Sequence, residues 1–235
     1  MLGRGAVHKH RDVQDGAARA AVFGISDGLV SNVSLILGIA GASTDPSIIR
    51  VAGISGLLAG AVSMAAGEYV SLQAQKELVE RELLIEKKSI DINLEAETEE
   101  LKSIYEERGI DSDLAEEVAR QIMSNSEIAL EVHVREELGV NPGQLGNPLL
   151  AASSSFVSFS FGAFVPLIPW LIGEGNSAIW TSAIMGIFST ALVGGVLARL
   201  SGRSVFKTST RQMLVAAAAC SVTYLIGSLL GASIT

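Results

Sequence analysis

The sequence has a single cysteine, only five prolines, few aromatic residues and none of the common catalytic motifs. One cysteine, Cys220, excludes a disulfide framework and a cysteine-based metal centre. There is no Ser/His/Asp set, phosphate-binding loop or HExxH motif, and His8 and His10 fall in a tail that looks disordered. We therefore do not expect an enzyme, a permanently bound cofactor or a nucleic-acid partner.

Charged residues are absent from three long apolar stretches, at about 149–172, 178–198 and 213–233. Two further apolar stretches, at about 20–42 and 48–70, each contain a carboxylate, Asp27 and Glu68 respectively. About 20 apolar residues suffice to cross a bilayer as a helix. The first stretch is too long for a signal peptide and is followed at once by another. The sequence thus predicts an all-α polytopic membrane protein with five spans.

Residues 76–137 form an acidic insert with 19 Asp/Glu against 8 Lys/Arg. Most of the other Lys and Arg residues lie in the N-terminal segment and in the loop from Arg199 to Arg211. Positively charged loops usually face the cytosol, so we expect the N-terminal segment, this loop and the insert to be cytosolic. The predicted organisation is a cytosolic segment 1–19, spans one and two over 20–75, a cytosolic metal-binding domain over 76–142, and spans three to five over 143–235.

The insert is expected to be helical throughout. No proline or glycine interrupts the chain between Gly67 and the region 88–93, so the second span should continue as one helix into the cytosol. A second helix is predicted over about 94–108, ending at Gly109. Helices three and four are expected to begin at Asp113-x-x-Glu116 and at the capping box Ser124-x-x-Glu127, where Glu127 caps its helix rather than binding metal.

The two membrane carboxylates are candidate transport residues. A carboxylate at membrane depth costs about 2.5–3.5 kcal/mol on insertion scales, so it usually faces a pore, a partner or an ion. Met64 lies four residues before Glu68, and Asp27 and Met64 fall at depths of roughly 9–11 Å, close enough to share a transition-metal ion. The alternatives are that Glu68 is only interfacial and that Asp27 pairs with a lysine or arginine.

Acidic pairs at helical spacing make the insert a candidate metal site. Like charges at these spacings destabilise a helix unless a cation compensates, and carboxylates with an imidazole suit Fe(II), Mn(II) or Zn(II). A solvated acidic helix would have the same pattern, and the spacing alone favours that reading. The candidate ligands are Glu82 with Glu86, Glu97 with Glu100, and His133 with Glu137.

Four stretches resemble the vacuolar iron transporter family of proton-coupled Fe(II)/Mn(II) carriers: FGISDGLVSNVSLILGIAGA (Phe23–Ala42), SMAAGEYVSLQAQ (Ser63–Gln75), IYEERG (Ile104–Gly109) and REELG (Arg135–Gly139). The resemblance implies that Asp27 and Met64 line the translocation path. It also implies that Glu86, Glu97 and Glu100 are metal ligands of the insert. Members of the family are homodimers with the first span at the seam.

The insert departs from the family pattern at three positions. His133 and Val134 stand where plant members have two methionines, and Ser89 stands where metal-binding members have a glutamate. These departures affect the number and preference of ions in the insert.

Together these features predict a dimeric, proton-coupled exporter of Fe(II) and Mn(II) from the cytosol, in which Asp27 exchanges proton for metal. The rival hypothesis is a membrane-anchored metal sensor or store that does not transport. The high Ala/Gly content suggests a prokaryotic inner membrane, with a vacuolar membrane as the alternative.

Overall fold

The structure, a computed structural model, describes residues 16–139 and 146–234. The N-terminal tail with His8 and His10 lies outside the described residues. Within them the chain forms helices and short connections and no strand, which confirms the all-α prediction. Five helices are long and apolar enough to cross a membrane, as the sequence predicts: Ala17–Ala42, Pro46–Ile92, Pro148–Ile172, Gly175–Leu200 and Val205–Gly231.

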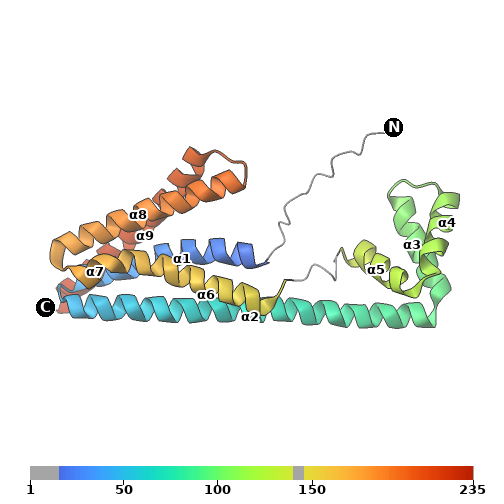
Figure 1. The fold of residues 1–235 in the computed structure, drawn as a ribbon, viewed down its shortest axis with the longest axis horizontal. Helices are drawn as coiled ribbons and strands as arrows, with labels where there is room; N and C mark the ends of the chain where they lie inside the picture. The colour runs from blue at the N-terminus through green and yellow to red at the C-terminus, as the bar shows by residue number, and fades with distance from the viewer. Residues whose placement is uncertain (1–15, 140–145, 235) are drawn as a thin grey trace, which may run out of the picture. The chain divides into compact units, whose positions relative to one another are not determined.

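The chain divides into two compact units. Helix α2 (Pro46–Ile92) belongs to both, because its first half lies in one unit and its second half in the other (Figure 1). The first unit holds the residues up to Val70 and from Gly146 onward. Its other elements are α1 (Gly16–Ala42), α6 (Pro148–Phe164), the 3-10 turn η2 (Val165–Leu167), α7 (Ile168–Ile172), α8 (Gly175–Leu200) and α9 (Val205–Ile234). The second unit begins at Ser71 and holds α3 (Leu94–Glu107), α4 (Ser112–Met123) and α5 (Ser126–Leu138).

Helix α1 is the central element of the first unit and packs most extensively against α6, with α9 and α8 on its other sides. The approach to α6 is close because glycines face backbone across the contact. A Cβ at Gly28 would overlap the carbonyl of Phe159, and one at Gly162 would overlap the carbonyl of Ile25. Small residues therefore allow the two backbones to touch, as in other membrane helix pairs.

Helix α2 is far longer than a membrane span needs. Its 47 residues correspond to about 70 Å at 1.5 Å per residue, whereas a bilayer core is about 30 Å thick. It ends at Ile92, and the side chain of Asn93 caps α3 by accepting a hydrogen bond from the Ala96 amide. Gly109 (φ +89°) and Gly139 (φ +66°) follow α3 and α5 in the left-handed conformation that favours glycine.

The two predicted capping positions for α4 and α5 are wrong. Asp111 caps α4 by accepting from the Asp113 amide, and Ser124 closes the end of α4 instead of opening α5. Only two residues separate these helices, and Asn125 is the last residue before α5. Its side-chain oxygen accepts a hydrogen bond from the Ile128 amide and so caps α5.

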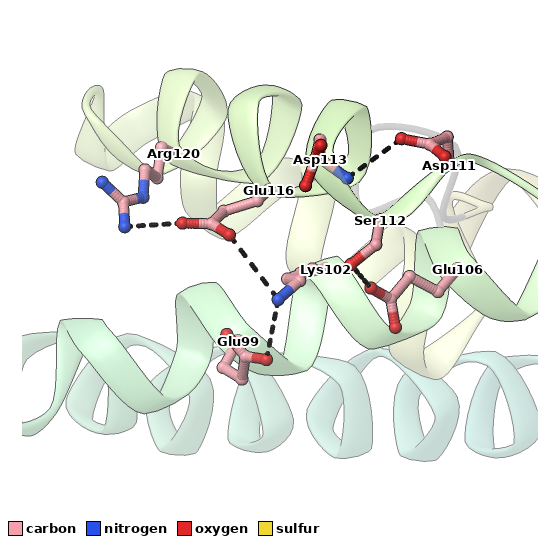
Figure 2. Close-up of polar contacts among 8 residues, drawn as sticks. All are labelled: Glu99, Lys102, Glu106, Asp111, Ser112, Asp113, Glu116 and Arg120. Carbon is pink, nitrogen blue, oxygen red and sulfur yellow. Dashed lines mark hydrogen bonds and ion pairs between the residues drawn. The ribbon is translucent and has the colours of Figure 1, made fainter.

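The second unit combines a small apolar core with a polar network on its α3–α4 face. Buried Leu101, Ala119 and Met123 belong to the core, together with Ile90 and Ala129. Figure 2 shows Lys102 of α3 between Glu99, 3.2 Å away, and Glu116 of α4, 3.7 Å away. One ammonium group thus links α3 to α4, whose Glu116 also pairs with Arg120 at 2.7 Å.

Candidate metal path and metal centre

Asp27 and Met64 line one cavity in the first unit. The cavity has a volume of about 290 Å³ and lies between α1, α2 and α6, with Phe159 of α6 in its wall. The full lining is Phe23, Asp27, Ser31, Asn32, Leu35, Gly56, Gly60, Ser63, Met64 and Phe159. The structure therefore brings together the carboxylate and the thioether that the sequence placed at equal depth.

Small residues on α2 keep this cavity open. Gly56 and Gly60 face it, and a Cβ at Gly60 would overlap the ring of Phe159. On α1 the side chains of Phe23, Asp27 and Ser31 follow one another at intervals of four residues and are exposed. The carboxylate of Asp27 is thus presented along an open edge of the single chain, and no ion pair within the described residues involves it.

The chemistry of the lining suits a divalent transition metal. It offers a carboxylate oxygen (Asp27), a thioether sulfur (Met64) and an amide oxygen (Asn32), a mixture of hard and soft donors. The hydroxyl of Ser31 donates to the backbone carbonyl of Asp27 at 2.6 Å, so its oxygen keeps lone pairs free for a cation.

Glu68 does not line the cavity. Its carboxylate accepts from the guanidinium of Arg19 at 3.0 Å, and its side chain is only 12% exposed. The sequence alternative, in which a membrane carboxylate pairs with an arginine, thus describes Glu68 and not Asp27. Arg19 precedes the first apolar stretch and Glu68 ends the second, and antiparallel neighbouring spans place both at the same membrane face. That signal was available in the sequence.

In the second unit, three predicted ligands form one cluster. Glu86 of α2 and His133 and Glu137 of α5 each offer an atom, and these atoms lie within 4.8 Å of one another. The imidazole of His133 is fully buried, with Nδ1 2.6 Å from Glu86 and 3.6 Å from Glu137. On the other side of the ring, Nε2 lies 3.1 Å from the backbone carbonyl of Glu97 and 3.5 Å from its carboxylate.

These contacts fix the roles of the two imidazole nitrogens. A carbonyl can only accept, so Nε2–H donates to Glu97, and Nδ1 is the ring nitrogen that faces Glu86. Metal-binding histidines usually have this arrangement, with one nitrogen held by a carbonyl and the other directed at the metal. Nδ1 and Oε1 of Glu86 lie 2.6 Å apart, and neither atom has a hydrogen-bond partner among the described residues.

Burial and neighbouring carboxylates favour the protonated form of Glu86. Desolvation, only partly offset by His133, together with the negative charges of Glu137 and Glu97, raises the pKa of Glu86 to about 7. The pKa of Glu97 is also raised, chiefly by burial. A metal ion bound at this cluster would therefore compete with a proton near neutral pH.

The other two acidic candidates lie outside the three-residue cluster. Glu100 is exposed and acts on Glu97 only through its charge, while Glu82 is half-buried one turn before Glu86 on α2. Sequence periodicity paired Glu82 with Glu86, and Glu97 with Glu100, because it sees only neighbours on one helix. The structure instead pairs residues from different helices around His133.

Five spans, a carboxylate–thioether cavity and an acidic helical unit carrying a His/Glu cluster define a polytopic membrane protein with features for cation binding. The profile of the VIT family matches residues 18–228, nine-tenths of the sequence, and the chain belongs to that family. It is an integral membrane protein.

Several relatives are named vacuolar iron transporters. The chain is 35% identical over 230 residues to the "Vacuolar iron transporter" of Acanthamoeba castellanii, covering 96% of this chain and 83% of that one. It is 29% identical over 206 residues to "Vacuolar iron transporter 1" of Arabidopsis thaliana, covering 86% and 82%. A Toxoplasma gondii protein named "Vacuolar iron transporter" is 28% identical over 240 residues, covering 96% and 80%.

Proposed function

We propose that this protein transports iron across its membrane, as the names of its relatives indicate for them, and that it exports Fe(II) and Mn(II) from the cytosol in exchange for protons. The observation that carries this proposal is the cavity in which Asp27 and Met64 lie together within the membrane-crossing unit. A store or sensor needs no carboxylate inside its anchor, where burial in hydrocarbon is costly.

In this proposal Asp27 carries the coupling. A carboxylate binds either a proton or a metal ion through the same oxygens, so one ion must leave before the other enters. A proton entering from the far side would protonate Asp27 and release the metal there. Loss of that proton to the cytosol would free the carboxylate to accept the next cation from the cytosolic side. Met64 provides a soft donor beside it, which favours transition metals over Ca²⁺ and Mg²⁺.

The cluster around His133 would collect metal before transport. Its donors are two carboxylates and an imidazole nitrogen from α2 and α5, a set that suits Fe(II), Mn(II) and Zn(II). The insert is cytosolic in this proposal because Arg199, Arg203, Lys207 and Arg211 lie between spans four and five on the side of the membrane where α2 leaves the bilayer. Collection and export then start from the same compartment.

The open edge of the cavity supports a homodimer. On α1, Phe23 is 60% exposed and Leu35 is 37% exposed, on either side of Asp27 along the helix. A carboxylate facing lipid would be unfavourable by a few kcal/mol. A second copy lying against α1 would cover the edge and turn the cavity into an enclosed path. We place the dimer in a prokaryotic inner membrane, with a vacuolar membrane as the alternative.

Purified protein in sealed proteoliposomes tests transport directly. We expect uptake of Fe(II) and Mn(II) that increases when the lumen is acidic, and a proton flux out of the lumen that depends on metal. Asp27→Ala should abolish uptake. Asp45→Asn is the matched control, because Asp45 caps α2 through the Ser47 amide and asparagine caps equally well.

The same vesicles separate the proposal from its rival. A sensor or store would bind metal in detergent with unchanged affinity but give no metal-dependent pH change inside the vesicles. Normal uptake by folded Asp27→Ala protein would contradict the role given to this carboxylate.

A further inference from the structure

Asn32 is the most unusual polar side chain in the membrane-crossing unit. It is 2% exposed, yet it lines the cavity that contains Asp27 and Met64. Its Nδ2 donates to the backbone carbonyl of Ala163 on α6 at 2.6 Å. Since a carbonyl can only accept, this hydrogen bond fixes which side of the amide is nitrogen and which is oxygen.

The amide oxygen is held on the other side and has no protein donor. Among the described residues nothing donates to Oδ1 of Asn32, although buried side-chain oxygens are nearly always hydrogen-bonded. Oδ1 faces Gly56 of α2, where a Cβ would lie 2.9 Å from it. Oδ1 itself is buried, and glycine at position 56 leaves no side chain of α2 packed directly over it.

We infer that Asn32 is a ligand of the transported cation, using Oδ1 as a neutral, hard oxygen donor beyond Asp27. This inference rests on the proposed transport function and adds a second cation-binding position to the same path. Asn32 lies five residues after Asp27, about 7.5 Å further along α1 at 1.5 Å per residue. An ion leaving the carboxylate would meet the amide next.

A neutral ligand suits such a position. Conduction needs sites that bind well enough to admit an ion and weakly enough to release it. A second carboxylate at this depth would hold a divalent cation too firmly, whereas an amide oxygen replaces one water of its hydration shell without adding charge. The hydrogen bond to Ala163 keeps this oxygen oriented between passages.

Cysteine substitution tests whether a cation contacts position 32. In a Cys220→Ser background, which removes the single native thiol, Asn32→Cys puts a soft thiolate where the hard oxygen stands. We expect the ratio of Cd(II) to Mn(II) uptake to rise by about tenfold or more, because thiolate favours the softer ion. Cd(II) added to the detergent-solubilised variant should also give a thiolate-to-metal charge-transfer absorption band.

Ser155→Cys in the same background is the matched control. Ser155 is fully buried on α6 and its hydroxyl also has no partner among the described residues, but it does not line the cavity. It should show neither the changed ratio nor the band. If folded Asn32→Cys protein behaves like this control, the inference is overturned, and Asn32 serves only to hold α1 against α6.

A second variant covers the case in which Asn32→Cys does not fold. Gly56→Ala leaves the amide in place and adds a methyl group in front of Oδ1, so Mn(II) uptake should fall by about fivefold or more. Undiminished uptake would contradict the inference. The charge-transfer band does not depend on transport. If the parent protein shows no uptake, the proposed function is refuted. The band would still show whether cations reach position 32.

Discussion

The raised pKa of Glu86 leads to a quantitative prediction for metal binding by the second unit. A cation that binds Glu86 must displace the proton that its carboxyl group holds at low pH. With a pKa of about 7, roughly 9% of Glu86 is ionised at pH 6 and roughly 91% at pH 8. The carboxyl group alone should therefore strengthen metal binding about tenfold between these pH values.

The contribution of Glu86 can be separated from that of the imidazole by substitution. We would measure Mn(II) affinity by equilibrium dialysis at pH 6, 7 and 8, using full-length protein with Asp27→Ala so that the membrane carboxylate does not bind. The same titration with an added Glu86→Gln keeps His133 intact. The loss of affinity caused by Glu86→Gln should be about tenfold larger at pH 8 than at pH 6.

An unperturbed glutamate predicts a different result. With the ordinary pKa of 4.5 the carboxyl group is almost fully ionised at both pH values, and the loss caused by Glu86→Gln would change by less than about 10%. A constant loss would therefore refute the argument that burial raises the pKa of Glu86. The raised pKa also affects the stability of the metal-free protein. Between about pH 4.5 and pH 7, Glu86 holds a proton in the folded state that it loses in the unfolded chain. The contribution of Glu86 to the free energy of unfolding therefore decreases as pH rises through this range.

Two further predictions concern stability. Gly28→Ala should destabilise the membrane unit by about 1–3 kcal/mol, because its methyl group would overlap the Phe159 carbonyl. In the control variant Gly67→Ala the new methyl group meets no neighbouring atom, so the change should be neutral or stabilising by up to about 1 kcal/mol. Thermal unfolding in detergent compares the two variants. Leu101→Ala removes a fully buried side chain and should cost about 2–5 kcal/mol, whereas half-exposed Leu94→Ala should cost much less. Hydrogen exchange of α3–α5 measures this difference, and equal protection in the two variants would contradict the assigned core.

Much of the fold could be predicted because membrane insertion imposes simple rules. Runs of about 20 residues without charge can hardly avoid being spans, and a helix without proline or glycine continues past the bilayer, as α2 does to Ile92. Asn93 and Gly109 end helices by local chemistry that is visible in the sequence. The caps at Asp111 and Asn125 were missed because several polar residues compete in a short connection, and backbone geometry decides among them.

The candidate sites were harder to predict, since ligands meet between helices. Residue counting along the spans placed Asp27 and Met64 at similar depths, and the structure puts both in one cavity. Depth does not show how each helix is rotated about its own axis, and this rotation decides which side chains share a cavity. Glu68 has a favourable depth yet pairs with Arg19. In the insert, periodicity along one helix could not show that Glu86 and Glu97 meet on opposite sides of the His133 ring.

The proposed route places a strong site before a weak one, which raises the question of how an ion leaves the strong one. The cluster around His133 has several carboxylates, whereas the membrane cavity has Asp27 with neutral donors only. Charge alone would therefore trap a divalent cation in the insert. Burial eases release, because it disfavours the ionised form of Glu86 and so lowers the cost of returning a proton to it as the ion leaves. The burial that weakens Glu86 as a ligand thus favours delivery over storage, and a variant with a more exposed, fully ionised Glu86 should bind metal more tightly and transport it more slowly.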